Sequence, residues 1–521
     1  MPLDELLPKA ADLYPHREAV VCGNLRWTYR AFAGRVWQLA HGLKGLGLVK
    51  GDRLAIIHEN CHVFLETYFA AAQLGLILVP MNFRLSPKEL ATIVQDSGSR
   101  TLIVQAKFRD AIDSLSSHGS VPHNTIWTQR VSGMTGPHEW DYEALLKAHP
   151  ATPPPDAALE DEDIAQLYYT SGTTGKPKGV MLTHKNVKTH ALGTIAELQL
   201  TDRDHWVHVA PLFHLADAWA TFAITWAGGK HVIISSFDPE TVFGAIEREK
   251  VTITNLIPTM LNMMVHHPKV AQYDYSSLRV LLSGGAPIAP ELVRKIIETF
   301  NTDYIQTYGM TETSPYLTLS ILKRHLRDLP QEEQLRFKAR TGREFINVRL
   351  KVVDEKDREV ARDDRQVGEI IVKGDIVTPG YWNMPEETSK AIRDGWLHTG
   401  DLAVIDEEGY VNIVDRKKDM IITGGENVYS TEVENVLYMH PHVLEAAVIG
   451  VPDPHWGEAV KACVVLKEGC KATEEEIISF CKERLAHYKA PKSVDFLQAL
   501  PKTGSGKIYK RALKEKYRAE S

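Results

Sequence analysis

Apolar residues recur at helical and then strand spacing along the first eighty residues. Thr28 can begin a helix, and the apolar positions that follow it are three or four residues apart. These positions are Phe32, Val36, Leu39, Ala40 and Leu43. A strand at 53–57, a helix at 63–74 and a strand at 76–79 continue the alternation. Both strands are continuously apolar, which indicates a sheet covered on both faces and predicts an α/β fold.

Further along the chain the pattern changes twice. Residues 117–162 show little periodicity and are expected to form a connection. After Gly342 the pattern predicts β hairpins, including 368–374 and 404–414, which form a part resembling a β-barrel. The C-terminal elements expected are a helix at 430–439, strands at 444–450 and 460–466, a helix at 473–486 and a strand at 493–497. They predict a small α+β domain of usual size.

Composition narrows the class of protein. The 521 residues are 44% hydrophobic with a formal net charge of −7, so we expect a globular protein whose main partner is not nucleic acid. The five cysteines form no Cys-x-x-Cys pair, which indicates neither a disulfide framework nor a zinc site and favours a reducing compartment. No apolar run is long enough to span a membrane. We therefore expect a cytoplasmic protein with a small-molecule substrate.

Residues 169–180 carry the clearest chemical signal. They follow the apolar run 164–168 and combine glycines, hydroxyl side chains and lysines, which suits a polyphosphate. The segment is not a Walker A loop, because no Gly-Lys pair of the chain is followed by Ser or Thr. A polar surface loop is the alternative. The candidate phosphate-binding residues are Thr170, Ser171, Gly172, Thr173, Thr174, Gly175 and Lys176.

Two strand-and-turn units add a candidate nucleotide site. Adjacent glycines end the strand of the first unit, where a planar ring could approach the backbone. In the second unit a tyrosine offers a stacking face, a threonine a donor, and Glu312 a carboxylate for Mg²⁺, although an ordinary loop glutamate is the alternative. The candidates are Gly284, Gly285, Ala286, Pro287, Gln306, Thr307, Tyr308, Gly309, Thr311 and Glu312.

Three further candidates each have an ordinary structural alternative. Asp401, on a tight turn, can accept both hydroxyls of a ribose or can simply close an Asx turn. The charged run 415–419 is usually a solvated turn. Lys507 follows Gly-Ser-Gly, which gives either a mobile arm carrying a positive charge or a basic surface turn.

In this order the motifs resemble those of the adenylate-forming superfamily, which includes acyl-CoA synthetases, aryl-CoA ligases, beetle luciferases and the adenylation domains of peptide synthetases. The resemblance covers nearly the whole chain. It implies an AMP-forming acid–thiol ligase that uses ATP, Mg²⁺ and coenzyme A. A carboxylic acid would be joined to AMP with release of pyrophosphate, and a thiol would then displace AMP.

The resemblance also implies a role for single residues. Tyr308 would lie on adenine, Thr311 would contact the α-phosphate and Glu312 would bind magnesium. Asp401 and Arg416 would bind ribose, and Lys507 would be the catalytic lysine.

The acid and thiol sites are implied in the same way. His214, in Pro211-Leu-Phe-His214, would lie beside the carboxylate of the acid, with Trp219 and Phe222 in the acyl pocket. By residue type alone, a core histidine and a core apolar helix are the alternatives. Gly424 and Gly425 would leave room for the pantetheine arm of CoA.

The resemblance places the hinge at Lys418, between an N-terminal ATP- and acyl-binding domain (1–415) and a mobile C-terminal domain (416–521) that carries the catalytic lysine. The segment 324–342 most resembles medium- and long-chain fatty-acyl-CoA synthetases. An aryl- or cyclic-acid CoA ligase, an adenylate donor to a carrier protein, and a nucleotide-binding sensor are the alternatives. The oligomeric state, including a homodimer, is left open.

Overall fold

The computed structural model describes residues 3–117, 122–129, 138–171, 177–286, 288–502 and 508–519. The chain divides into two compact units. Unit 1 comprises Met1–Arg349 and Val372–Leu397, and unit 2 comprises Leu350–Ile371 and His398–Ser521. The domain boundary expected at residue 415 stays a prediction.

Unit 1 contains two mostly parallel sheets. In the first, the strands lie in the order β7-β6-β5-β3-β4-β8-β9. Their bounds are β7 Glu139–Asp141, β6 Asn124–Thr128, β5 Thr101–Gln105, β3 Arg53–Ile57, β4 Ile77–Pro80, β8 Ile164–Ser171 and β9 Pro177–Thr183. The second sheet runs β16-β15-β14-β13-β12-β10-β11-β1-β2. Its bounds are β16 Gly342–Glu344, β15 Tyr316–Leu319, β14 Asp303–Gly309, β13 Val280–Gly284, β12 Ile253–Asn255, β10 His205–His208, β11 Lys230–Ile233, β1 Glu18–Cys22 and β2 Leu25–Thr28.

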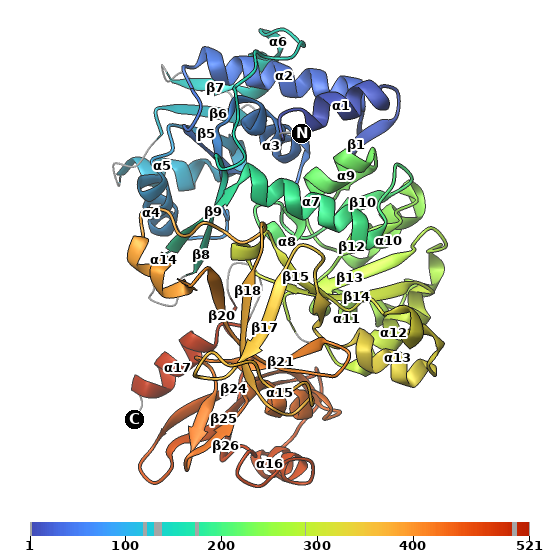
Figure 1. The fold of residues 1–521 in the computed structure, drawn as a ribbon, viewed down its shortest axis with the longest axis vertical. Helices are drawn as coiled ribbons and strands as arrows, with labels where there is room; N and C mark the ends of the chain where they lie inside the picture. Colours follow the sequence, from blue (N-terminus) through green and yellow to red (C-terminus); the bar gives the residue numbers. More distant parts are fainter. Residues whose placement is uncertain are drawn as a thin grey trace. The chain divides into compact units, whose positions relative to one another are not determined.

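Helices fill the space between these sheets and cover their outer faces. The inner helices are α2 Tyr29–Gly45, α3 His62–Leu74, α7 His184–Leu198 and α9 Ala220–Ala227. α3 contacts both β4 and β1, and α7 contacts β8, β9 and α9. Figure 1 shows α7 between the strands of the two sheets. The outer helices are α4 Pro87–Ser97 and α5 Arg109–Ser117 on the first sheet, and α10 Pro239–Glu249 and α12 Pro290–Phe300 on the second.

Shorter helices complete unit 1. They are α1 Leu6–Leu13, α6 Tyr142–Lys147, α8 Leu215–Ala218, α11 Pro258–Val265, α13 Gln331–Lys338 and α14 Pro385–Ala391. The helix expected after Thr28 is confirmed, and the Thr28 hydroxyl accepts a hydrogen bond from the Ala31 amide at 3.3 Å. Residues 54–57 of β3 have no exposed area, as expected for a strand covered on both faces.

The expectation that residues 117–162 form only a connection is wrong. This segment supplies β6 and β7 to the edge of the first sheet and the helix α6 that contacts them. β6 pairs in parallel with β5, and its Trp127 is 1% exposed. A strand of five residues between polar stretches is too short to show a periodicity, so tertiary packing decides its structure.

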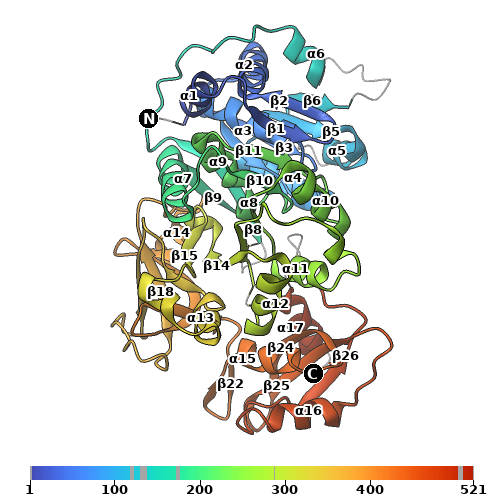
Figure 2. The same cartoon turned by 90° about the vertical axis from the view of Figure 1, so that its right-hand side faces the viewer.

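Unit 2 begins with the strands β17 Arg349–Val353, β18 Gly368–Lys373, β20 Trp396–Ile405 and β21 Tyr410–Arg416, in that order. The short strand β19 Ile392–Arg393 pairs with β20. The second sheet of this unit has the order β23-β22-β25-β24, with β26 beside β25. Its bounds are β22 Ile421–Thr423, β23 Glu426–Val428, β24 Val443–Asp453, β25 Gly457–Leu466 and β26 Ser493–Phe496. Figure 2 shows α15 Ser430–Tyr438, α16 Glu474–Lys482 and α17 Lys510–Ala519 around this sheet.

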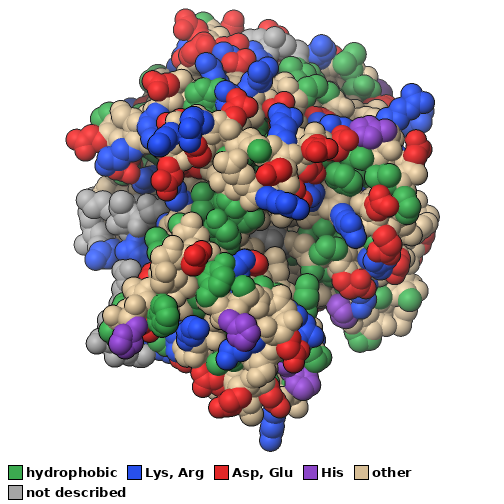
Figure 3. Space-filling model, turned by 60° about the horizontal axis from the view of Figure 1, so that its bottom comes forward, with side chains coloured by type: hydrophobic (Ala, Val, Ile, Leu, Met, Phe, Trp, Pro, Cys, Tyr) green, Lys and Arg blue, Asp and Glu red, His purple; other side chains and the backbone are tan. Residues whose placement is uncertain are grey.

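Charged side chains of both signs are mixed on the surface that Figure 3 shows, without a large area of one sign. In the part of the chain that the structure describes, no helix is long and apolar enough to cross a membrane.

His184, the first residue of α7, makes stability dependent on pH. Its side chain is buried, and neither ring nitrogen has a hydrogen-bond partner among the described residues. Burial lowers the pKa of His184 to about 4, while the unfolded chain has an ordinary histidine pKa of about 6.5. The unfolded state therefore binds the proton first, and stability falls as the pH drops from 6.5 towards 4.

We expect His184→Phe to remove this loss, because phenylalanine has a similar shape and takes up no proton. Between pH 7 and pH 5 the wild-type protein should lose about 2 kcal/mol more unfolding free energy than the variant. Urea denaturation at both pH values measures the difference. Equal pH dependence of the two proteins would show that His184 does not contribute.

Candidate nucleotide and acid site

The strand pair β8–β9 of unit 1 brackets the candidate phosphate loop. Thr170 pairs with Lys178 and Ser171 with Pro177 in an antiparallel register. Five of the predicted phosphate-binding residues lie outside the described residues, and so do Pro287 and Lys507. These five are Gly172, Thr173, Thr174, Gly175 and Lys176.

Residues 380–382 lie along β9 and hold it in place. The Trp382 amide donates to the Gly179 carbonyl at 2.7 Å, and the Met181 amide donates to the Gly380 carbonyl at 3.1 Å. Lys178 Nζ lies 2.6 Å from Glu387 Oε2. The strand that follows the phosphate loop is therefore fixed by a segment about two hundred residues further along the chain.

Glu312 is tied to the same segment. It lies in the short helical turn Thr311–Thr313 after β14, and it is 7% exposed. Tyr381 Oη donates to Glu312 Oε1 at 2.9 Å, and the Thr378 amide donates to the Glu312 carbonyl at 2.8 Å. Burial and the adjacent Glu312 raise the pKa of Tyr381, so this phenol keeps its proton and remains a donor.

The ends of β13 and β14 pack too closely for a side chain at Gly284. A Cβ there would lie 2.3 Å from Thr307 Oγ1. Gln306 Nε2 donates to the Ala286 carbonyl at 3.0 Å, and this bond holds the turn that contains Gly285. The structure thus brings these nucleotide candidates together, with Tyr308 and Gly309 at the end of β14.

His214 is the N-cap residue of α8, and its Nδ1 accepts a hydrogen bond from the Ala216 amide at 3.1 Å. The preceding residues are fixed by Asn60, whose amide donates to the Ala210 carbonyl at 2.8 Å and accepts from the Leu212 amide at 2.7 Å. Tyr68 Oη donates to the Leu212 carbonyl at 2.9 Å. The position of His214 is therefore set by buried polar contacts as well as by its own helix.

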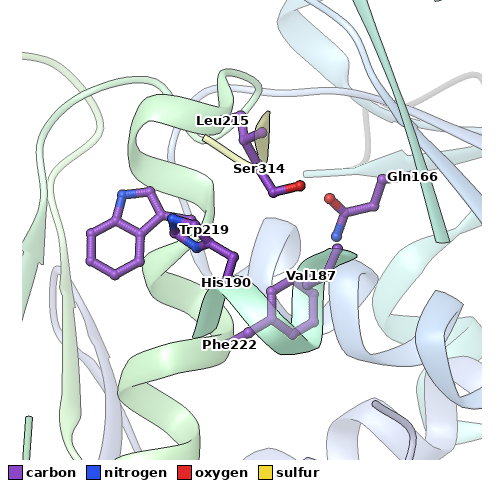
Figure 4. Close-up of a pocket in the computed structure, with 7 residues that line it drawn as sticks. All are labelled: Gln166, Val187, His190, Leu215, Trp219, Phe222 and Ser314. Carbon is purple, nitrogen blue, oxygen red and sulfur yellow. The ribbon is translucent and has the colours of Figure 1, made fainter. Parts of the chain in front are cut away.

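A small cavity, with room for little more than one water molecule, lies beside these residues in unit 1. Its lining residues, which Figure 4 shows, are Gln166, Val187, His190, Leu215, Trp219, Phe222 and Ser314. Leu215 directly follows His214, and Ser314 is two residues after Glu312. Both predicted acyl-pocket residues, Trp219 and Phe222, are thus at one cavity near the candidate carboxylate and metal residues.

The Trp219 ring is held from two sides. Its Nε1 donates to the Ala216 carbonyl at 3.1 Å, and its ring centroid lies 4.9 Å from that of Trp206 in an edge-on arrangement. Trp206 Nε1 in turn donates to the buried Asp217 carboxylate at 3.0 Å. A ring fixed in this way presents a defined wall to the cavity.

In unit 2 the two ribose candidates are cross-strand neighbours. Asp401 of β20 pairs with Arg416 of β21, and Arg416 Nε lies 3.4 Å from Asp401 Oδ1. The Lys418 carbonyl accepts a hydrogen bond from Lys514 Nζ at 3.1 Å. Asp401 thus lies within a strand and not on the tight turn expected from the sequence, and the structure brings the two ribose candidates together.

Gly424 and Gly425 form the two-residue turn between β22 and β23. Their φ angles are +60° and +84°, a combination that the favoured hairpin turn requires and that glycine adopts without strain. A Cβ on Gly424 would lie 2.8 Å from the Trp456 ring, whereas one on Gly425 would meet no atom within 4 Å. The turn alone explains both glycines, and a role towards pantetheine stays a prediction.

Three residues that shape the candidate site were not predicted from the sequence: Tyr381, Gln166 and Asn60. Tyr381 and Gln166 lie in stretches without a motif, so no local signal identifies them. Asn60 carries a weak signal, because a polar residue between a buried strand and an apolar helix often binds backbone groups.

Comparison with known proteins gives matches along nearly the whole chain. Residues 7–382 match the AMP-binding enzyme family, and residues 432–507 match the AMP-binding enzyme C-terminal domain. A feruloyl-CoA synthase of Amycolatopsis sp. is 39% identical over 512 residues, which are 98% of each chain. A long-chain-fatty-acid–CoA ligase of Mycobacterium tuberculosis is 36% identical over 99% of this chain and 98% of its own.

A solved structure agrees with these sequence matches. The ATP-bound MatB structure from Rhodopseudomonas palustris has a TM-score of 0.88 and 29% identity, covering 99% of each chain. The α/β fold, the two sheets of unit 1 and the small C-terminal sheet are those of this group of enzymes. The chain therefore belongs to the AMP-binding, adenylate-forming enzyme family, and it is an AMP-forming acid–CoA ligase.

Proposed function

We propose that the enzyme activates an aryl or short-chain carboxylic acid as its acyl-adenylate and transfers the acyl group to coenzyme A. One observation carries this proposal: a small cavity walled by aromatic rings lies beside the turn that holds the buried Glu312. Glu312 and Ser314 belong to the same turn region, so the organic part of an acid in the cavity would be close to the nucleotide candidates.

The first step keeps both oxygen atoms of the acid on the acyl group, and the second leaves one of them on AMP. In the first, a carboxylate oxygen attacks the α-phosphorus of ATP, and the bond from that phosphorus to pyrophosphate breaks. In the second, the sulfur of CoA attacks the acyl carbon, the thiol proton is lost, and the bond to the AMP oxygen breaks. The first step needs alignment and charge stabilisation more than a protein nucleophile.

Separate groups of residues would align the substrates and stabilise the developing charge. We assign phosphate binding to residues 170–176 and Thr311, and the neutralisation of developing charge to Lys507. Gly284 to Pro287, together with Gln306 to Gly309, would border the adenine, with Tyr308 as the stacking ring. Asp401 would accept the ribose hydroxyls, with its carboxylate oriented by Arg416.

Mg²⁺ fits Glu312. A magnesium ion in a nucleotide site is usually bound by one or two carboxylates together with substrate phosphates, so a cluster of protein ligands is not required. Among the described residues, no group of three or more His, Cys, Asp or Glu side chains could hold a metal ion. When bound, Mg²⁺ would neutralise charge on the phosphate oxygens. The Tyr381 hydroxyl orients the Glu312 carboxylate for this task.

The choice of acid is supported by the cavity. Trp219, Phe222 and His190 give it flat walls, which suit a ring or a short chain better than a long flexible one. The relatives named above include both an aryl and a fatty-acid ligase. A medium- or long-chain fatty acid is the second candidate, on the resemblance of segment 324–342.

The reaction class is tested by its products. We expect AMP and pyrophosphate in equal amounts when ATP, CoA and an aryl acid are supplied, and neither product without an acid. A panel of benzoates, cinnamates and saturated acids of increasing length, measured by kcat/KM, ranks the candidates. A maximum at long saturated acids would favour the second candidate, and ADP as the product would contradict the proposal.

Glu312→Gln tests the magnesium role. The amide keeps the shape and still accepts the Tyr381 hydrogen bond but loses the negative charge. We expect the magnesium concentration for half-maximal adenylation to rise at least about tenfold, with adenosine binding little changed. Tyr381→Phe is the matched control, because it removes the orienting hydrogen bond and keeps the charge, and we expect a smaller shift. An unchanged magnesium dependence of Glu312→Gln would make this residue structural.

Lys507 and Lys418 should separate the two half-reactions. We expect Lys507→Ala to fail in adenylation but to convert supplied acyl-adenylate to acyl-CoA. Lys418→Pro, which fixes φ at the proposed hinge, should make the adenylate and transfer it slowly. Single-turnover assays of each half decide this, with Lys516→Ala, an exposed lysine of α17, as control. Equal loss of both half-reactions in both variants would contradict a mechanism in which the mobile C-terminal domain takes one position for adenylation and another for transfer to CoA.

A further inference from the structure

The short helix α8 lies between two candidate residues of the acid site. His214 caps its N-terminus, and Trp219 caps its C-terminus. A helix of four residues has too few internal hydrogen bonds to be stable alone, so contacts with the rest of unit 1 must fix its position. Figure 4 shows Leu215 of α8 and Trp219 together at the cavity.

Asp217 is the charged residue of α8, and its side chain is completely buried. Its Oδ1 accepts a hydrogen bond from Trp206 Nε1 at 3.0 Å, and its Oδ2 accepts one from His208 Nδ1 at 2.8 Å. Both donors belong to β10, so the two carboxylate oxygens hold α8 on one strand. Burying a carboxylate is costly, and an apolar residue of similar volume would avoid the cost. The carboxylate is therefore better explained by the orientation of α8 than by packing.

The hydrogen bonds of Asp217 continue into a buried chain of two imidazoles. His208 Nε2 lies 2.9 Å from His231 Nδ1, and His231 Nε2 lies 2.8 Å from Thr225 Oγ1. These three side chains have no exposed area. Burial and the adjacent His208 lower the pKa of His231 well below its ordinary value, so this ring stays neutral. The chain of bonds joins α8 to β10, β11 and α9.

The same network extends to the Trp219 ring. The Ala216 carbonyl of α8 accepts from Asn255 Nδ2 of β12 at 2.9 Å and from Trp219 Nε1 at 3.1 Å. The Trp219 ring packs edge-on against Trp206, the residue that donates to Asp217. A displacement of Asp217 would therefore move both the helix that His214 caps and the wall of the cavity.

The polarity of the network predicts which substitution it accepts. Because an indole can only donate, the amide oxygen in Asp217→Asn would face Trp206 and the NH₂ group would face His208. His208 would then accept on Nδ1 and donate from Nε2 to His231, which would donate from its own Nε2 to Thr225. The Thr225 hydroxyl can accept as well as donate. The chain thus stays satisfied in Asp217→Asn, whereas Asp217→Ala leaves two buried donors without an acceptor.

We infer that Asp217 is a positioning residue of the acid site. Through Trp206 and His208 it holds α8 on β10, and it thereby fixes both His214 and the Trp219 ring. This inference rests on the proposed function, in which those two residues border the acid. It assigns a role in binding the acid to a carboxylate that touches no substrate.

The test measures pyrophosphate exchange with ATP and an acid that the wild-type enzyme adenylates, taken from benzoate, cinnamate and hexanoate. In Asp217→Ala we expect the KM for the acid to rise at least about tenfold, because small displacements of positioning groups are costly. The KM for ATP should stay within about twofold. In Asp217→Asn the KM for the acid should stay within about threefold of the wild-type value, since the hydrogen bonds are kept.

Thr254→Val is the matched control. Thr254 is also buried, and its hydroxyl donates to the Val207 carbonyl of β10 at 2.8 Å, so its bond goes to the strand and not to α8. We expect a loss of stability in this variant with both KM values unchanged. A purely structural role of Asp217 would give the same result, because partial unfolding lowers the amount of active enzyme and leaves KM as it was.

Hydrogen exchange without substrates gives a readout independent of turnover. In peptides that cover residues 206–222, we expect faster exchange for Asp217→Ala than for the wild-type protein and for Asp217→Asn. Should Asp217→Ala fail to fold, Trp206→Phe replaces it. This variant removes the donor to Asp217 Oδ1 and keeps a ring against Trp219, and we expect the KM for the acid alone to rise about threefold.

Three results would overturn the inference. They are an unchanged KM for the acid in Asp217→Ala or its replacement, an equal rise in the KM for ATP, and an effect of Asp217→Asn as large as that of Asp217→Ala. In each case the proposed CoA ligase function would stand. If no acid at all supported pyrophosphate exchange by the wild-type enzyme, the proposed function itself would fail, and unchanged hydrogen exchange in Asp217→Ala would separately show that Asp217 does not hold α8.

Discussion

A buried carboxylate, that of Glu312, is the feature on which the described site of unit 1 depends. Burying an anion is costly unless donors or cations meet it, and Glu312 receives a hydrogen bond from Tyr381. Tyr381 belongs to the segment that runs along β9, the strand that follows the candidate phosphate loop. One hydrogen bond thus couples the end of β14 to the phosphate-loop strand, although the two lie far apart in sequence.

Beside this charged region the chain builds a cavity of opposite character. Its lining is aromatic and uncharged, with neutral polar atoms from Gln166 and Ser314. Under the proposed function, charge and backbone geometry would recognise the nucleotide, whereas the shape and the neutral polar groups of the cavity would recognise the acid. Because the groups that would bind the nucleotide differ from those that line the cavity, the identity of the acid could change without altering the chemistry at phosphorus.

The sequence was sufficient for features carried by local patterns. The helix after Thr28 and the strand at 53–57 follow from periodicity, and the family resemblance rests on ordered motifs. Contacts made by tertiary packing had no such signal. Tyr381 acts through a partner sixty-nine residues away, Gln166 lies within the apolar run 164–168, and β6 is too short to show a period. Gly424 and Gly425 form a turn with positive φ angles, and this turn is a sufficient reason for both glycines. From residue type alone, a turn and a binding role could not be distinguished.

The central claim is that the acid is activated through its own oxygen as an acyl-adenylate. The most direct measurement uses an acid whose carboxylate carries a heavy oxygen isotope, with mass spectrometry of the AMP formed in the complete reaction with CoA. The account predicts that each AMP molecule receives one oxygen from the acid, because the carboxylate attacks the α-phosphorus and the thiol later breaks the acyl carbon–oxygen bond. AMP without the label, or label in pyrophosphate, would contradict it.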